Sequence, residues 1–96
     1  MSEVHDNHRL GRFELDADGH LAVAYYERRD GIITFTHTEV PKALEGRGIG
    51  SRLAKGALAL ARAEGHKVIA RCPFIAGYIQ KHPEFADLVG GAGSKA

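Results

Sequence analysis

The sequence lacks a second cysteine, a long apolar run and the apolar segment of a signal peptide. It has 96 residues and a single cysteine, Cys72, which excludes an internal disulfide framework and any multi-cysteine zinc site. No run approaches the roughly 18 apolar residues that a membrane-spanning helix needs. We therefore expect one small cytoplasmic domain over residues 9–89, with a disordered tail over residues 1–8, a flexible tail over residues 90–96 and no metal site.

The net charge of +1 conceals an uneven distribution of charged residues. Residues 1–40 contain four Arg and Lys against eight Asp and Glu, a net −4, whereas residues 41–96 contain nine against four, a net +5. This asymmetry favours an anionic partner for the second part, although a solvated basic helix face gives the same pattern. Nucleic acid is the weaker choice of partner, because the aromatic residues are not interleaved with the basic ones.

The first half of the chain has the pattern of an antiparallel meander of three strands. Alternating polar and apolar residues, followed by a run rich in β-branched side chains, predict strands over residues 12–15, 20–28 and 32–40. Asp-Gly pairs at 18–19 and 30–31 separate these segments and are typical of tight hairpin turns. Pro41 ends the third strand, because proline cannot donate a ladder hydrogen bond.

The second half changes to helical spacing. Apolar residues recurring every three or four positions predict a helix from Ile49 that stops at Gly65. A short buried strand over 68–70 follows this crossover helix and should pair in parallel. Cys72-Pro73 then begins a second helix that runs to His82. The predicted order is β-β-β-α-β-α, in the α/β (α+β) class.

The segment Leu44-Glu45-Gly46-Arg47-Gly48-Ile49-Gly50-Ser51 stands where a strand gives way to a helix. Three glycines in five residues allow consecutive N–H groups to turn inward as an anion nest, beside the positive end of the helix. A pyrophosphate fits such a nest, with Arg47, Arg52 and Lys55 as counter-charges. The alternative is a glycine-rich turn without a ligand.

Two familiar nucleotide-binding motifs are missing at this loop. A P-loop needs Gly-Lys-Ser/Thr, but Ser51-Arg52 follows Gly50. A dinucleotide fingerprint needs a glycine where Ser51 stands, and the chain has too few βαβ units for a doubly wound sheet.

The glycine segment, after a strand ending in Val40-Pro41, resembles motif A of the GNAT N-acetyltransferases. Residues 72–85 extend the resemblance to the small, single-domain members of that superfamily, from about Phe13 to Val89. The resemblance implies a GNAT-like fold, acetyl-coenzyme A as co-substrate and an amine acceptor, with a non-catalytic acyl-coenzyme A binding module as the alternative. The implied coenzyme-binding residues are Val40, Glu45, Gly46, Arg47, Gly48, Ile49, Gly50 and Ser51, with Glu45 standing where the motif usually has Gln or Arg.

The same resemblance suggests catalytic roles for Glu39, Cys72 and Tyr78. Glu39 or His37, two residues apart on one strand face, is a candidate base for the amine proton, and a solvated carboxylate is the alternative for Glu39. Cys72 is a candidate covalent nucleophile at a helix start or else a small buried residue. Tyr78 resembles the tyrosine that protonates the departing thiolate, or is a core aromatic. An exposed sheet edge is compatible with a homodimer.

Overall fold

The computed structural model describes residues 3–89 and contains one five-stranded sheet in the order β1-β2-β3-β4-β5. The first four strands are antiparallel to their neighbours, and β4 and β5 are parallel. The strands are β1 (His5–Asn7), β2 (Arg12–Ala17), β3 (His20–Arg29), β4 (Ile32–Glu39) and β5 (Lys67–Ala70). The α-helices are α1 (Ile49–Ala63) and α2 (Pro73–Lys81), and the 3₁₀ segments are η1 (Lys42–Leu44) and η2 (Pro83–Leu88). The predicted fold class is confirmed.

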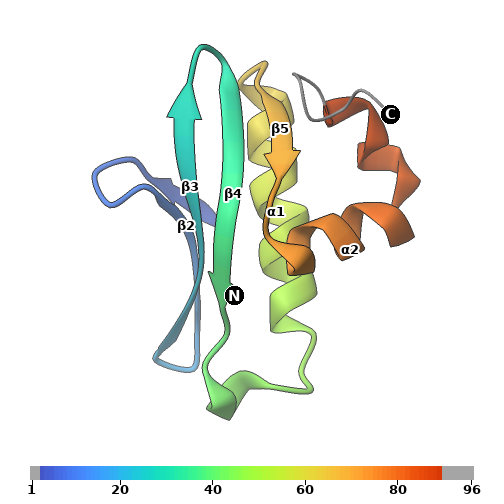
Figure 1. The fold of residues 1–96 in the computed structure, drawn as a ribbon. Coiled ribbons are helices and arrows are strands. Elements are labelled where there is room, and N and C mark those ends of the chain that lie inside the picture. The colour runs from blue at the N-terminus through green and yellow to red at the C-terminus, as the bar shows by residue number, and fades with distance from the viewer. Residues whose placement is uncertain (1–2, 90–96) are drawn as a thin grey trace.

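The two helices lie along the same side of the sheet (Figure 1). Their apolar residues and the side chains of the facing sheet surface form one buried cluster, to which β2 contributes Phe13, β4 contributes Phe35, and the helices contribute Leu53 and Ile75. The other sheet surface, which points away from α1 and α2, is called the open face below. Among residues 3–89, no helix is long and apolar enough to cross a membrane.

Local signals explain the turns and the end of α1. Asp18 and Asp30 have φ angles of 52° and 53°, and the glycine after each is also left-handed, as a type I′ hairpin requires. At the end of α1, the Gly65 amide donates to the Arg62 carbonyl and the His66 amide to the Ala61 carbonyl. This is the paired C-terminal bond pattern that a left-handed glycine allows.

The N-terminal segment is more ordered than the sequence predicted. Residues 5–7 form β1, so the predicted disordered tail over residues 1–8 is wrong for them. Asp6 accepts hydrogen bonds from the Tyr26 hydroxyl and from Arg28, and the side-chain amide of Asn7 donates to Glu14. These partners are distant in sequence, so local composition gave no sign of them. Residues 1–2 and the predicted tail over 90–96 lie outside the described part of the chain.

Glu14 makes the stability of the fold depend on pH. Burial raises the pKa of its carboxyl, but hydrogen bonds from Arg12 and Asn7 outweigh burial, and the pKa lies below its ordinary value of 4.5. A lowered folded pKa stabilises the protein above the unfolded pKa, and this contribution is lost as the pH falls through the folded value. Below about pH 4.5, we expect the free energy of unfolding to decrease more steeply with falling pH in the wild type than in Glu14→Gln. Urea titrations at several pH values measure this difference. Identical pH dependence in both proteins would contradict the assignment.

Candidate functional site

The parallel pair of strands opens at one end. β4 pairs with β5 only from Ile32 to Phe35. There the Phe35 carbonyl accepts hydrogen bonds from the amides of Arg71 and Cys72, at 3.0 and 3.1 Å. β5 ends at Ala70, whereas β4 continues to residue 39. The last part of β4 is therefore left with an unpaired backbone edge on the β5 side, where an extended ligand can form hydrogen bonds.

A bulge in β4 decides which side chains face which way beyond this point. Tyr26 pairs with Phe35 and Tyr25 pairs with His37, so Thr36 is an extra residue. An extra residue reverses the alternation of side chains that follows it. His37 and Glu39 consequently reach the open face, where each side chain is 60% exposed and their nearest atoms, Nε2 and Oε2, are 3.1 Å apart.

The glycine segment over residues 46–51, called the nest from here on, alternates in backbone conformation, and its binding of an anion stays a prediction. Gly46 and Gly48 have φ angles of 78° and 73°, while Arg47 between them does not have a positive φ. Such alternation turns successive N–H groups toward one side. The first helical bond of α1 runs from the Arg52 amide to the Gly48 carbonyl, and within residues 3–89 no amide from 46 to 51 donates to a backbone carbonyl.

Gly50 has a different role from the other two glycines. A Cβ atom on Gly50 would lie 2.8 Å from Cζ of Phe74, so the glycine lets the start of α2 pack on the start of α1. The Phe74 side chain is 42% exposed and lies beside the nest. This contact was not predicted, because nothing near Gly50 in the chain indicates which distant residue packs there.

Ionic contacts modify the expected coenzyme site. Arg47 pairs with Asp18 of the β2–β3 turn, with NH2 and Oδ2 2.5 Å apart and both side chains about half exposed. The Glu45 amide donates to the Lys42 carbonyl and is therefore not directed to a ligand. The first turn of α1 contains no acidic residue, so nothing in it opposes an anion at the helix N-terminus.

Cys72 lies on the helix side of β4. Its side chain is buried, and Sγ is 3.2 Å from Oγ1 of Thr38. Cys72 is the N-cap of α2, though its side chain makes no capping bond. Because Thr38 faces the opposite way from Glu39 along the strand, Cys72 and Glu39 lie on opposite faces of the sheet. The Thr38 contact was not predicted.

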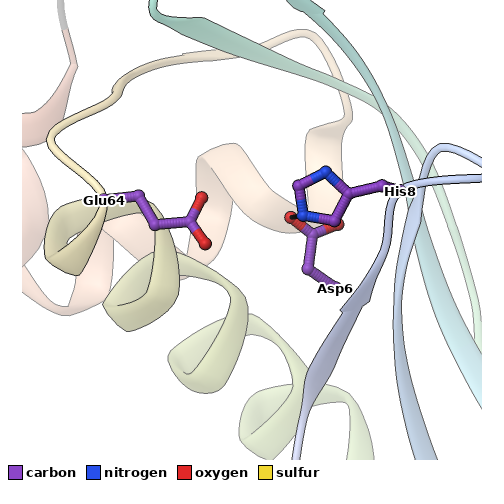
Figure 2. Close-up of side chains that lie close together, drawn as sticks. All are labelled: Asp6, His8 and Glu64. Atoms are coloured by element: carbon purple, nitrogen blue, oxygen red, sulfur yellow. Dashed lines mark ion pairs between the residues drawn. The ribbon is translucent and has the colours of Figure 1, made fainter.

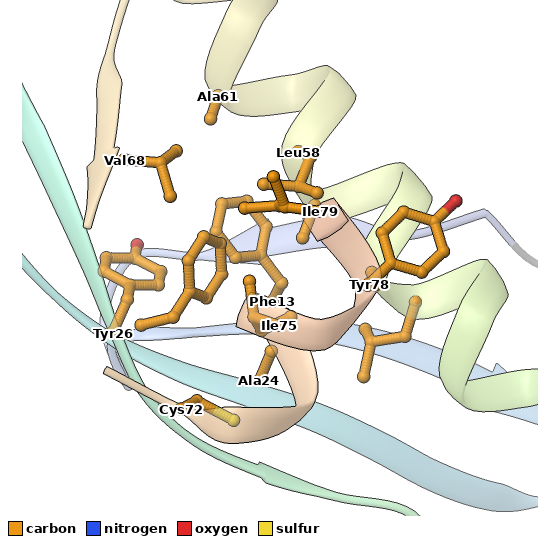
Figure 3. Packing of buried hydrophobic residues seen from close by; sticks show 14 of the residues in the cluster. Phe13, Ala24, Tyr26, Leu58, Ala61, Val68, Cys72, Ile75, Tyr78 and Ile79 are labelled. Atoms are coloured by element: carbon orange, nitrogen blue, oxygen red, sulfur yellow. The ribbon is translucent and has the colours of Figure 1, made fainter. Parts of the chain in front are cut away.

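Tyr78 lies on α2 beside a cavity that Cys72 and Glu39 do not line. Its ring stacks on that of His82, with centroids 4.0 Å apart, and its hydroxyl points away from Cys72 (Figure 3). Burial, and then the charge of Glu84, raise the pKa of Tyr78 above its ordinary value. A cavity of about 250 Å³ adjoins it, lined by Ser51, Pro73, Phe74, Gly77, Tyr78, Lys81 and His82. The cavity joins Tyr78 to the end of the nest at Ser51, but the three predicted catalytic side chains do not converge on one point.

One further group of ligand-type side chains lies at the opposite end of α1. Asp6, His8 and Glu64 place oxygen or nitrogen atoms within 4.8 Å of one another (Figure 2). Arg28 already contacts both carboxylates of this group, since its Nη2 is 2.7 Å from Asp6 and its Nη1 is 3.7 Å from Glu64. A metal ion would have to displace that guanidinium. The absence of a metal site stays a prediction.

The structure is a mixed α/β protein in which an opened pair of strands lies beside a glycine-rich helix start, a combination suited to an anionic ligand. Comparison with known proteins makes this more specific. Residues 12–88 match the family described as GCN5-related N-acetyl-transferase, and the chain belongs to that family. The resemblance seen in the sequence is thereby confirmed.

Similar proteins agree with this family. The chain is 42% identical over 52 residues to Protein NATD1 of Gallus gallus and of Homo sapiens, which covers 54% of this chain. The match spans 47% and 46% of those relatives, just under half of their length. The NMR structure of a GCN5-like protein from Staphylococcus aureus superposes with a TM-score of 0.68 at 29% identity, covering 93% of this chain and 88% of the other.

Gly48 and Gly77 offer a matched test of the nest backbone. At neither position would an added Cβ lie within 4 Å of a heavy atom beyond the adjacent residues and the helix's own backbone, but only Gly48 has a positive φ. We expect Gly48→Ala to destabilise the fold by roughly 1–2 kcal/mol through left-handed strain. Gly77→Ala, inside α2, should stabilise it by roughly 0.5–1 kcal/mol. Urea unfolding measures both, and equal effects would contradict the backbone assignment.

Proposed function

We propose that this protein binds acetyl-coenzyme A and transfers the acetyl group to an amine. Family membership supports the reaction class. The observation that carries the proposal is one juxtaposition: the amides of residues 46–51 follow closely after the part of β4 that lacks a β5 partner. An elongated ligand with a pyrophosphate and a polar arm can use both features at once.

Binding requires little rearrangement of the nest. The pyrophosphate accepts hydrogen bonds from the amides of residues 46–51 and interacts with the positive end of α1. Arg47 can exchange Asp18 for a phosphate oxygen, because an exposed ion pair is weak. The pantetheine arm then extends along the free edge of β4 toward Val40.

The open face supplies the base for the transfer. As the amine nitrogen bonds to the thioester carbon, Glu39 or His37 accepts the proton that the amine loses. A backbone N–H near Val40 donates to the developing oxyanion. The C–S bond then breaks, and Tyr78, which is protonated at neutral pH like any tyrosine, gives its proton to the departing thiolate.

Cys72 offers a second route for the acetyl group. Its thiolate would attack the thioester, release coenzyme A and then yield the acetyl group to the amine. Its burial and its contact with Thr38 favour direct transfer instead, with Cys72 as a packing residue. Acetyl transfer by Cys72→Ala separates the routes, because only the covalent route needs the thiol.

A non-catalytic binding module is the second candidate function. One observation favours it: the side chains of Glu39, Cys72 and Tyr78 do not converge on one point. Such a module would bind acetyl-coenzyme A through the same nest but would leave amines unmodified.

Titration calorimetry with acetyl-coenzyme A, followed by mass spectrometry of a lysine peptide and of spermidine, tests the proposal. We expect binding and transfer, with Glu39→Gln slowing transfer by roughly 10²–10⁴-fold if Glu39 is the base. His37→Gln should show the larger loss if His37 is the base. Glu27→Gln, an exposed carboxylate of β3, is the control. No binding at millimolar ligand contradicts the proposal, and binding without transfer supports the module.

Asp18→Asn tests whether Arg47 meets the ligand. Loss of the carboxylate frees Arg47 and removes a negative charge near the nest. Acetyl-coenzyme A should therefore bind about two- to fivefold more tightly at low salt, because an exposed ion pair contributes roughly 0–1 kcal/mol. Asp30→Asn is the matched control, because Asp30 occupies the equivalent left-handed position of the other hairpin turn. An equal change in both variants, or none, would show that Arg47 is not part of the site.

A further inference from the structure

Three side chains form a row across the open face of the sheet, one from each of three adjacent strands. The register places Arg12 opposite Tyr25 and Tyr25 opposite His37. NH1 of Arg12 donates to the Tyr25 hydroxyl at 3.3 Å. The Tyr25 ring stacks with the His37 imidazole, with centroids 6.2 Å apart and planes inclined by 16°. The row therefore ends at the His37–Glu39 pair.

The other end of the row is anchored by a buried charge. Glu14 is the one buried charged residue within residues 3–89. Its Oε2 accepts hydrogen bonds from Nε of Arg12 at 2.6 Å and from Nδ2 of Asn7 at 3.0 Å, and its Oε1 is 3.0 Å from Nε2 of His5. Exclusion of water strengthens these charge-assisted contacts, so the Arg12 guanidinium is held in one place.

The His37–Glu39 pair needs such support. Both side chains are 60% exposed, and an exposed pair without other contacts samples several rotamers at little cost. The Tyr25 ring lies nearly parallel to the imidazole of His37, with centroids 6.2 Å apart, and is the neighbouring ring that can limit its orientations. In the observed orientation, Nε2 of His37 lies 3.1 Å from Oε2 of Glu39.

We propose that Tyr25 is a positioning residue that holds His37 against Glu39, and that Arg12, fixed by Glu14, holds Tyr25. The inference rests on the proposed function, in which the His37–Glu39 pair takes the amine proton. When Tyr25 holds the His37–Glu39 pair in place, the base is directed at the acceptor in most protein molecules at any moment. The loss of Tyr25 should therefore lower kcat and leave coenzyme binding unchanged.

Two variants of Tyr25 separate its ring from its hydroxyl. Tyr25→Leu removes both, and we expect kcat to fall about tenfold, less than the roughly 10²–10⁴-fold contribution of a general base itself, while the affinity for acetyl-coenzyme A stays unchanged. Tyr25→Phe keeps the ring and should retain most of kcat. Asp16→Asn, an exposed residue on the same face of β2, is the control.

The ¹⁵N chemical shifts of the His37 imidazole, recorded on the full chain without coenzyme, supply a readout independent of activity. We expect Tyr25→Leu and Glu39→Gln to move them in the same direction, toward a solvent-averaged imidazole, and Asp16→Asn to leave them in place. Unchanged shifts in Tyr25→Leu overturn the proposal, whatever happens to kcat. If Tyr25→Leu does not fold, Arg12→Gln replaces it, with a smaller shift expected and no shift as the contrary result.

Failure of the proposed function is distinguishable from failure of this inference. A wild-type protein that transfers no acetyl group overturns the proposed function, but its imidazole shifts still decide whether Tyr25 orients His37. A fall in kcat with equal loss of coenzyme affinity in Tyr25→Leu indicates a structural role and also overturns the proposal.

Discussion

The carbonyl of Phe35 accepts hydrogen bonds from two successive amides, those of Arg71 and Cys72. The rest of the site depends on this pair of hydrogen bonds. It ends the parallel pairing of β4 with β5 and turns the chain away from the sheet into α2. Had β5 continued in register, its backbone would have covered the edge of β4 that is now open. One acceptor thus opens a gap between the two strands and also places Cys72 at the start of a helix.

The bulge at Thr36, the next residue along β4, places the candidate site residues on two different faces of the sheet. It turns His37 and Glu39 to the open face, while Thr38 meets Cys72 on the helix side. In the proposed reaction, a thioester in the gap between the strands would meet the base, Glu39 or His37, from the open face and the thiol of Cys72 from the helix side. This arrangement suits direct transfer, since an acceptor on the open face does not reach a sulfur buried behind the strand.

How far the sequence predicts such a structure depends on the range of the interactions. The Asp-Gly turns, the glycine stop of α1 and the alternating backbone of the nest are local, so they could be predicted from a few adjacent residues. Strand β1 could not, because Asp6 is held by Tyr26 and Arg28, more than a dozen residues away. The bulge has no residue signature here, and it alone determines whether Thr38 or Glu39 faces the helices.

The charged residues also show that composition can be read from the sequence whereas ion-pair partners cannot. The acidic first part and the basic second part suggested an anion site, yet Arg47 of the nest pairs with Asp18 of the sheet. In the proposed complex, a phosphate would therefore compete with a carboxylate of the same chain for Arg47. On the open face the ion pair of Arg12 with Glu14 is more enclosed: its side chains are 21% and 8% exposed, so water and ligands compete less for it. The two ion pairs thus differ in burial: the exposed Arg47–Asp18 pair is the more easily exchanged, and the enclosed Arg12–Glu14 pair is the better support for the side chains beside it.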